Sequence, residues 1–158
     1  IGAATETEMK ERKSRAEDAL HATKAAVAEG IVPGGGTALV RAAAALQWLK
    51  LDAEAQEGVE VVRLALDTPF RQICLNAGVD GSIKLRDVLR KDDPDFGYDA
   101  DKGETCNLIS RGVIDPTRVV KTAVQNAASV AGLLLTTKCV IVDEPGKKEH
   151  DAHAGHHH

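Results

Sequence analysis

The sequence predicts a mainly α fold, a helical bundle with a small β-hairpin and a lone C-terminal strand. Long stretches of strong helix formers that end at glycine or proline predict the helices. One longer run, Cys139–Val142, is typical of a strand and has no obvious partner of similar length. Of the 158 residues, 43 % are hydrophobic, 28 % are charged and only 3 % are aromatic. Small aliphatic side chains must therefore fill the core of a globular protein.

The charge balance and the cysteines exclude several classes of protein. A net charge of −4, with both signs spread along the chain, provides no basic face for nucleic acid. No run approaches the roughly 18 consecutive apolar residues of a membrane span, and residues 1–10 lack the apolar stretch of a signal peptide. Three cysteines lie far apart among apolar neighbours, which indicates buried thiols and a reducing, cytoplasmic location. They are Cys74, Cys106 and Cys139.

The first and longest helix is predicted over residues 6–29, with Gly30 as its stop. Its first half is polar on nearly every side, which is typical of a helix that connects domains. Thr68 is the expected N-cap of another helix, with Pro69 at its first position and Gly78 at its end. Further helices are expected over residues 37–50, 53–66, 82–90 and 104–111.

The second half of the chain contains a loop and the clearest helix. Residues 91–103 are rich in Asp, Pro and Gly and predict a loop with a small hairpin around Tyr98. Asp115 is the expected cap of the last helix, with Pro116 at its first position and Thr137 near its end.

The C-terminal end is predicted to contain a strand and a polar, disordered tail. A lone strand over Cys139–Val142 needs a partner from a missing segment or from another subunit. The tail over residues 144–158 is open to three interpretations: a native metal-binding tract, an expression tag or a passive tail. Metal binding is a weak hypothesis there, and it would involve His150, His153, His156, His157 and His158.

Four features are candidates for chemistry, and each also has an ordinary structural interpretation. Asp18 lies within the first helix and fits a solvated charge, although Asp is a poor helix former. The glycines 34–36 precede a helix and fit either a tight turn or an anion-binding turn, without the ending of a Walker loop. Asp115 fits a helix cap or a carboxylate that accepts hydrogen bonds from ribose hydroxyls. Residues 98–101 fit a surface turn.

Five blocks of sequence resemble the group I chaperonin (GroEL) family, in that family's order, between residues 2 and 145. They are GAATETEMKE at 2–11, RAEDALHATK at 15–24, VPGGGTAL at 32–39, GVIDPTRV at 112–119 and QNAASVAGLLLTT at 125–137. The resemblance implies that residues 1–28 are the returning limb of an intermediate domain. Residues 29–143 would then be the C-terminal half of an equatorial, ATP-binding domain.

The resemblance also implies roles for individual residues. Asp18 corresponds to the catalytic aspartate that positions the attacking water, Gly35 to a nucleotide-contacting glycine, and Asp115 to the carboxylate that binds ribose. Asp99, Ala100 and Asp101 correspond to the loop beside adenine, where the family usually has Asn at the first position and often Ala at the third. This departure implies altered affinity for ATP and not its loss. Residues that support the nucleotide loop are Gly34, Gly36 and Val113.

Partners and cofactors follow from the same resemblance. Arg71 and Asp80 correspond to contacts between two back-to-back rings, although both also fit ordinary surface charges. The ligands of Mg²⁺ and K⁺ and the apical domain, which captures unfolded proteins and the co-chaperonin lid, lie outside this sequence. We therefore expect an ATP-hydrolysing, ring-forming folding machine for the complete subunit, and neither hydrolysis nor tight nucleotide binding for this chain alone. The rival interpretations are a self-associating helical module and a metal-handling protein.

Overall fold

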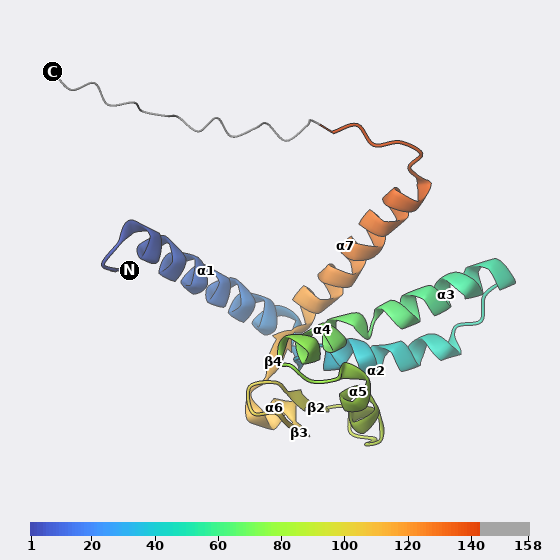
Figure 1. Cartoon of the computed structure of the whole chain (residues 1–158), viewed down its shortest axis with the longest axis horizontal. Coiled ribbons are helices and arrows are strands. Elements are labelled where there is room, and N and C mark those ends of the chain that lie inside the picture. Colours follow the sequence, from blue (N-terminus) through green and yellow to red (C-terminus); the bar gives the residue numbers. More distant parts are fainter. Residues whose placement is uncertain (143–158) are drawn as a thin grey trace.

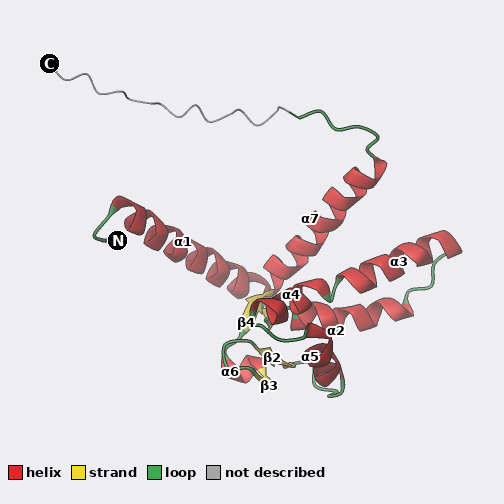
Figure 2. Ribbon diagram, viewed as in Figure 1, coloured by secondary structure: helices red, strands yellow, loops and turns green. Residues whose placement is uncertain are grey.

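A computed structural model describes residues 1–142 of the chain. Its helices extend in different directions from a compact centre, with α1, α7 and the α2–α3 pair projecting outward (Figure 1). The centre contains the short strands and the helices α4, α5 and α6 (Figure 2). The prediction of a mainly α fold is confirmed, but the long helices diverge from this centre and do not lie together along their lengths.

The first helix has the predicted bounds, with α1 spanning Glu6–Glu29. Thr5 caps it, because its side chain accepts a hydrogen bond from the amide of Glu8. Gly30 ends it at φ 80°, a conformation that favours glycine. No residue of α1 is buried, as expected for a helix that connects domains.

Two helices follow the glycine turn and form a projecting hairpin (Figure 1). α2 spans Thr37–Ala45 and continues as the short 3₁₀ helix η1, Leu46–Trp48, so the single helix predicted over residues 37–50 is shorter than expected. α3 spans Ala53–Ala65 and begins at Asp52, whose carboxylate accepts from the amide of Ala55 at 2.9 Å.

Helices α4 (Thr68–Asn76) and α5 (Gly81–Leu89) pack against each other. Thr68 is the first helical residue and not the cap as predicted, because Asp67 occupies the cap position. The Asp67 side chain makes no cap hydrogen bond and pairs instead with Arg71. The helix ends before Gly78, which follows in the left-handed region at φ 75°.

The predicted hairpin around Tyr98 is present as the antiparallel ribbon of β2 (Phe96–Asp99) and β3 (Glu104–Asn107). The helix predicted over residues 104–111 is therefore wrong in its first half, because strand pairing satisfies those backbone groups. Only α6, Leu108–Arg111, is helical, and the Asn107 side chain caps it at the amide of Ser110, 2.9 Å away.

A second ribbon pairs β1 (Ile31–Pro33) with β4 (Ile114–Pro116), and nothing in the sequence analysis predicted it. Asp115 lies opposite Val32 in this ribbon. The prediction that Asp115 caps the last helix is therefore wrong: α7 spans Thr117–Thr136, and its cap position is Pro116.

The lone strand predicted over Cys139–Val142 is not formed in this structure. Val140, Ile141 and Val142 are highly exposed, and no described segment pairs with them. An extended segment without a partner has no ladder of hydrogen bonds to make it a strand. The histidines of the predicted tail lie outside the described residues.

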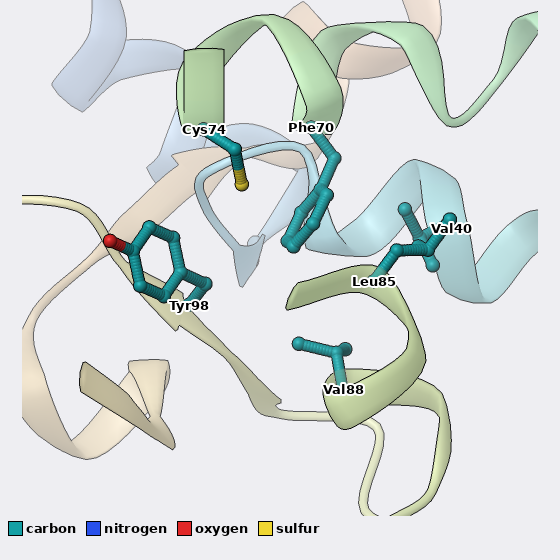
Figure 3. Close-up of a cluster of buried hydrophobic side chains, with 6 residues drawn as sticks. All are labelled: Val40, Phe70, Cys74, Leu85, Val88 and Tyr98. Carbon is teal, nitrogen blue, oxygen red and sulfur yellow. The ribbon is translucent and has the colours of Figure 1, made fainter. Parts of the chain in front are cut away.

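The core lies between α2, α4, α5 and β2 (Figure 3). Phe70 and Cys74 of α4 face Tyr98 of β2, and all three side chains are almost fully buried. Burying one large apolar side chain of this kind contributes about 1.5–3 kcal/mol. The other members of the core are Val40, Leu85 and Val88.

Helix α7 is long and apolar enough to cross a membrane by length and composition, with a mean hydropathy of 1.2. The prediction of no membrane span counted consecutive apolar residues, whereas hydropathy averages over the few polar ones. A single helix of this kind is a weak indication, since core helices of soluble proteins meet the same criterion. Its exposed apolar side chains indicate an interaction face; they are Val119, Val130, Leu133, Leu134 and Leu135.

The three cysteines differ in exposure, so the prediction that all are buried is wrong for Cys139, which is exposed. Cys74 is fully buried, and this burial raises the pKa of its thiol. We expect a thiol-alkylating reagent to modify Cys139 quickly and Cys74 only after unfolding, because the thiolate is the reacting species. Mass spectrometry of partly alkylated protein would check the order. Equal rates for the two cysteines would contradict it.

Candidate functional site

A glycine turn links β1 to α2 and lies against the segment that precedes β4. The amide of Gly34 donates to the carbonyl of Val113 at 2.9 Å. Gly35 and Gly36 have φ values of 64° and 76°, which glycine adopts without strain. Among the described residues, the amides of Gly35 and Gly36 donate no hydrogen bond. Free amides beside a helix start favour an anionic or polar ligand.

Asp115 lies beside this turn because β4 pairs with β1. Its carboxyl is half-buried and has no hydrogen bond or ion pair within residues 1–142. Burial raises the pKa of the Asp115 carboxyl, because a desolvated carboxylate loses stabilising contacts with water. A carboxylate in this state is available to accept hydrogen bonds from a ligand, such as a pair of hydroxyls.

We expect Asp115→Asn to make the chain more stable at neutral pH. The folded state holds the Asp115 proton more tightly than the unfolded state, whose pKa is about 3.9. The associated stability is complete below that value and is lost as pH rises through the raised pKa. Asn cannot ionise. Between pH 4 and pH 7 the variant should therefore lose less free energy of unfolding than the wild type, as measured by denaturant unfolding at both pH values. An unchanged pH dependence would contradict the prediction.

The β2–β3 ribbon brings the predicted adenine loop to the glycine turn. A Cβ built on Gly35 would lie 3.4 Å from the carbonyl oxygen of Tyr98, so the two backbones are close. Asp99 is only 7 % exposed, and its carboxylate accepts from the amides of Asp101 at 3.0 Å and Lys102 at 3.2 Å. The next residue, Ala100, packs against the core.

The turn at Asp99 can form with Asp, as in this chain, or with Asn, the residue that the resemblance implies at this position. Either side chain has an oxygen that accepts both amides, so the turn survives the exchange. Asn also has an NH₂ group that can donate a hydrogen bond to a ligand, whereas the carboxylate of Asp can only accept one. Asp101, in contrast, is exposed and pairs with Lys102 at 2.8 Å. The hydrogen bond from Lys102 lowers the pKa of Asp101.

Asp18 lies apart from the glycine turn, in a groove between α1 and α7. The groove has a volume of about 690 Å³, and its wall includes Asp18, His21, Lys24, Arg118, Thr122 and Asn126. Asp18 lies twelve positions before Gly30 along α1, a rise of about 18 Å. The structure therefore brings together the glycine turn, Val113, Asp115 and residues 98–101, and it does not bring Asp18 to them.

The sequence analysis missed an ion-pair cluster where α1 meets α7. Glu29 accepts a hydrogen bond from Lys121 at 2.8 Å, and Arg118 lies 3.9 Å away. The hydrogen bond from Lys121 lowers the pKa of Glu29, and both positive charges add to the effect. This cluster joins the last residue of α1 to α7, directly before Gly30. No local pattern predicts a pair between residues so far apart in the chain.

Arg71 and Asp80, the predicted ring contacts, are both engaged within the chain. Arg71 pairs with Asp67 at 2.7 Å and donates to the hydroxyl of Ser82 at 2.6 Å. Asp80 caps α5 by accepting from the amide of Ser82 at 2.7 Å. The bond from Arg71 to Ser82 joins α4 to α5. A role of Arg71 and Asp80 between rings stays a prediction.

Within residues 1–142, no group of three or more His, Cys, Asp or Glu side chains is arranged to hold a metal ion. The predicted histidines of the tail lie outside this range.

Residues 1–145 match the TCP-1/cpn60 chaperonin family. The fold is similar to a crystal structure of a group III chaperonin in the open state, with a TM-score of 0.79 and 37 % sequence identity. That match covers 89 % of this chain and 30 % of the other. The fold and the glycine turn thus have the architecture of a chaperonin segment.

The chain belongs to the TCP-1/cpn60 chaperonin family. It spans about 30 % of the length of the group III chaperonin that it matches. The matches do not distinguish the group I family from other chaperonins.

Proposed function

We propose that this chain is the C-terminal segment of an ATP-driven chaperonin subunit of the group I type. Residues 1–28 then form the returning limb of the intermediate domain, and residues 29–143 form half of the equatorial domain. The observation that supports this most is the meeting of the glycine turn, Asp115 and the β2–β3 ribbon. These features come from distant parts of the chain, and among residues 1–142 nothing pairs with the carboxylate of Asp115 or with the amides of Gly35 and Gly36.

The proposed chemistry divides the nucleotide among these features. Asp115 accepts hydrogen bonds from the ribose hydroxyls, the amides of the turn approach the nucleotide at Gly35, and residues 99–101 lie beside adenine. Asp18 orients the attacking water once α1 swings toward the nucleotide. Gly30 is the natural pivot, because it has a glycine conformation and a Cβ built on it would meet no atom within 4 Å.

ATP supplies the transferred phosphoryl group, and Mg²⁺ supplies neutralising charge when it is bound. In this proposal the ligands of Mg²⁺ and of K⁺ belong to the remainder of the subunit. The proposed partners are other subunits in cytoplasmic rings, unfolded client proteins and a co-chaperonin lid. Ring contacts at Arg71 and Asp80 are part of the same proposal.

We expect the purified 158-residue chain to release no phosphate from ATP above background, because it supplies only one side of the proposed site. A complete subunit that contains this chain should hydrolyse ATP. The measurement is phosphate release by both proteins at equal concentration with Mg²⁺ and K⁺. Substantial turnover by the short chain would contradict the division of the site. A folded, complete subunit that neither binds nor hydrolyses ATP would overturn the proposed function.

Self-association is a second candidate function of the isolated chain, and the exposed apolar side chains of α7 and α3 favour it. In a complete subunit these same faces would pack against other parts of the protein. Light scattering of the isolated chain tests self-association. The measured mass should then rise with protein concentration, and ATP should not alter that mass.

A further inference from the structure

Arg41 links three elements of the fold through one nitrogen atom. It lies on α2 one turn after Thr37, so both side chains are on the same face of the helix. Its Nη2 donates to the carbonyl of Val88 at 2.9 Å and to the carbonyl of Phe96 at 3.2 Å. The first carbonyl belongs to α5 and the second to the start of β2. Hydrogen bonds from a charged donor are stronger than neutral ones.

The contacts around Arg41 place β2 directly on the first turn of α2. A Cβ at Gly97 would overlap the hydroxyl of Thr37 and the side chain of Leu108, so strand and helix are in close contact. The same turn of α2 follows the glycine turn, and Tyr98 of β2 lies beside Gly35. The position of β2 on α2 therefore sets the distance between the ribbon and the glycine turn.

Apolar contacts also hold the ribbon near α2, but they are not directional. The β2–β3 ladder lies within the ribbon, and Tyr98 is anchored in the core together with Val40 of α2. Lys84 of α5 lies 4.9 Å from the centre of the Tyr98 ring and joins the ribbon to α5, not to α2. Among the described side-chain hydrogen bonds, the one from Arg41 to the carbonyl of Phe96 is the one that connects α2 to the backbone of β2.

We propose that Arg41 is a positioning residue of the nucleotide site. It fixes the distance between α2 and β2, the strand that leads into Asp99–Asp101. This distance sets the width of the space where adenine would bind. It touches no ligand itself and acts through the ribbon. The inference rests on the proposed function, because it assigns residues 99–101 to the adenine side of that site.

The test is the steady-state ATPase of a complete subunit that carries Arg41→Met, which keeps much of the side-chain volume and removes the donors. We expect the KM for ATP to rise about tenfold with kcat within about twofold of the wild type, because the lost contact affects binding alone. Arg63→Met is the matched control, since Arg63 is a surface residue of α3 whose hydrogen bonds go to Glu60. It should leave both constants unchanged.

Amide exchange in the 158-residue chain supplies a second measurement without nucleotide. Faster exchange in residues 96–99 of Arg41→Met, with α1 and α7 unaffected, is expected. A wild-type KM in the folded variant would overturn the positioning role. A fall in kcat as large as the rise in KM would also overturn it. If Arg41→Met does not fold, Arg41→Gln is too short to bridge both carbonyls, and the same KM rise decides the question. A wild-type subunit without ATPase activity would count against the proposed function instead.

Discussion

Replacing Asp18 with alanine in a complete subunit is expected to slow ATP hydrolysis at least about a hundredfold, the lower end for loss of a general base. ATP affinity should change little, because Asp18 lies in the α1–α7 groove and away from the glycine turn and Asp115. Single-turnover hydrolysis and equilibrium nucleotide binding measure the two quantities separately. The expected result is a stable complex that binds ATP and hydrolyses it slowly.

Glu17→Ala is the matched control for this variant. Glu17 is the neighbour of Asp18 on α1, and its carboxylate faces Lys13 at 3.7 Å on the exposed surface. An exposed pair of this kind contributes little to stability, so the control should hydrolyse ATP at the wild-type rate. Equal losses in both variants would show that the charge of α1 matters and not the position of Asp18. A fast Asp18→Ala subunit would remove Asp18 from the catalytic role.

Asp18 and Arg41 are expected to affect different constants. Loss of Asp18 should lower kcat with the KM for ATP nearly unchanged, whereas loss of Arg41 should raise KM with kcat unchanged. This opposition follows from their places in the fold. Asp18 lies on a helix that must move to reach the nucleotide.

The elements with local signals were predictable from the sequence. The run of strong helix formers and Gly30 predicted α1, and the turn residues around Tyr98 predicted the ribbon. The β1–β4 ribbon was not predictable, because its strands have three residues each and Val32 pairs with Asp115 across most of the chain. Short strands that pair over such a separation leave no periodic pattern in the sequence.

Asp115 shows how a local rule misled the prediction. An Asp before Pro is typical of a helix start, yet a residue that precedes proline is also pushed toward the extended region. Here the second effect dominates, since Asp115 pairs with Val32 as a strand residue and Pro116 is extended at ψ 128°. The carboxylate that would have capped α7 is thereby left free for a ligand.

The candidate site was predictable through resemblance and not through physical pattern. Each of its residues has an ordinary local interpretation, and only the folded chain shows which of them meet. The buried turn of Asp99, the ion pairs of Glu29 and the tie made by Arg41 all depend on distant neighbours. No spacing rule along one element finds such contacts.

Gly36→Ala is expected to be the most destabilising single substitution in the glycine turn. A Cβ at Gly36 would lie 2.7 Å from the backbone nitrogen and 2.8 Å from the Cα of Phe70, which is 1 % exposed. The left-handed φ of 76° costs an alanine about 1–2 kcal/mol. Overpacking against an immobile backbone adds about 1–3 kcal/mol. We therefore expect a loss of about 2–5 kcal/mol in the free energy of unfolding.

Substitutions at two other glycines distinguish the cost of the left-handed φ from the cost of overpacking. Denaturant unfolding of each variant measures these costs. Gly103 has a φ of 72° with no atom within 4 Å of a built Cβ, so Gly103→Ala measures the conformational cost alone. Gly58 lies in the interior of α3 in open space, and Gly58→Ala should stabilise the chain by about 0.5–1 kcal/mol. Of these three glycines, only Gly36 meets the backbone of α4, so its substitution must exceed Gly103→Ala in cost. A Gly36→Ala chain as stable as the Gly103→Ala chain would show that the turn can move away from Phe70, and with it the amides assigned to the nucleotide.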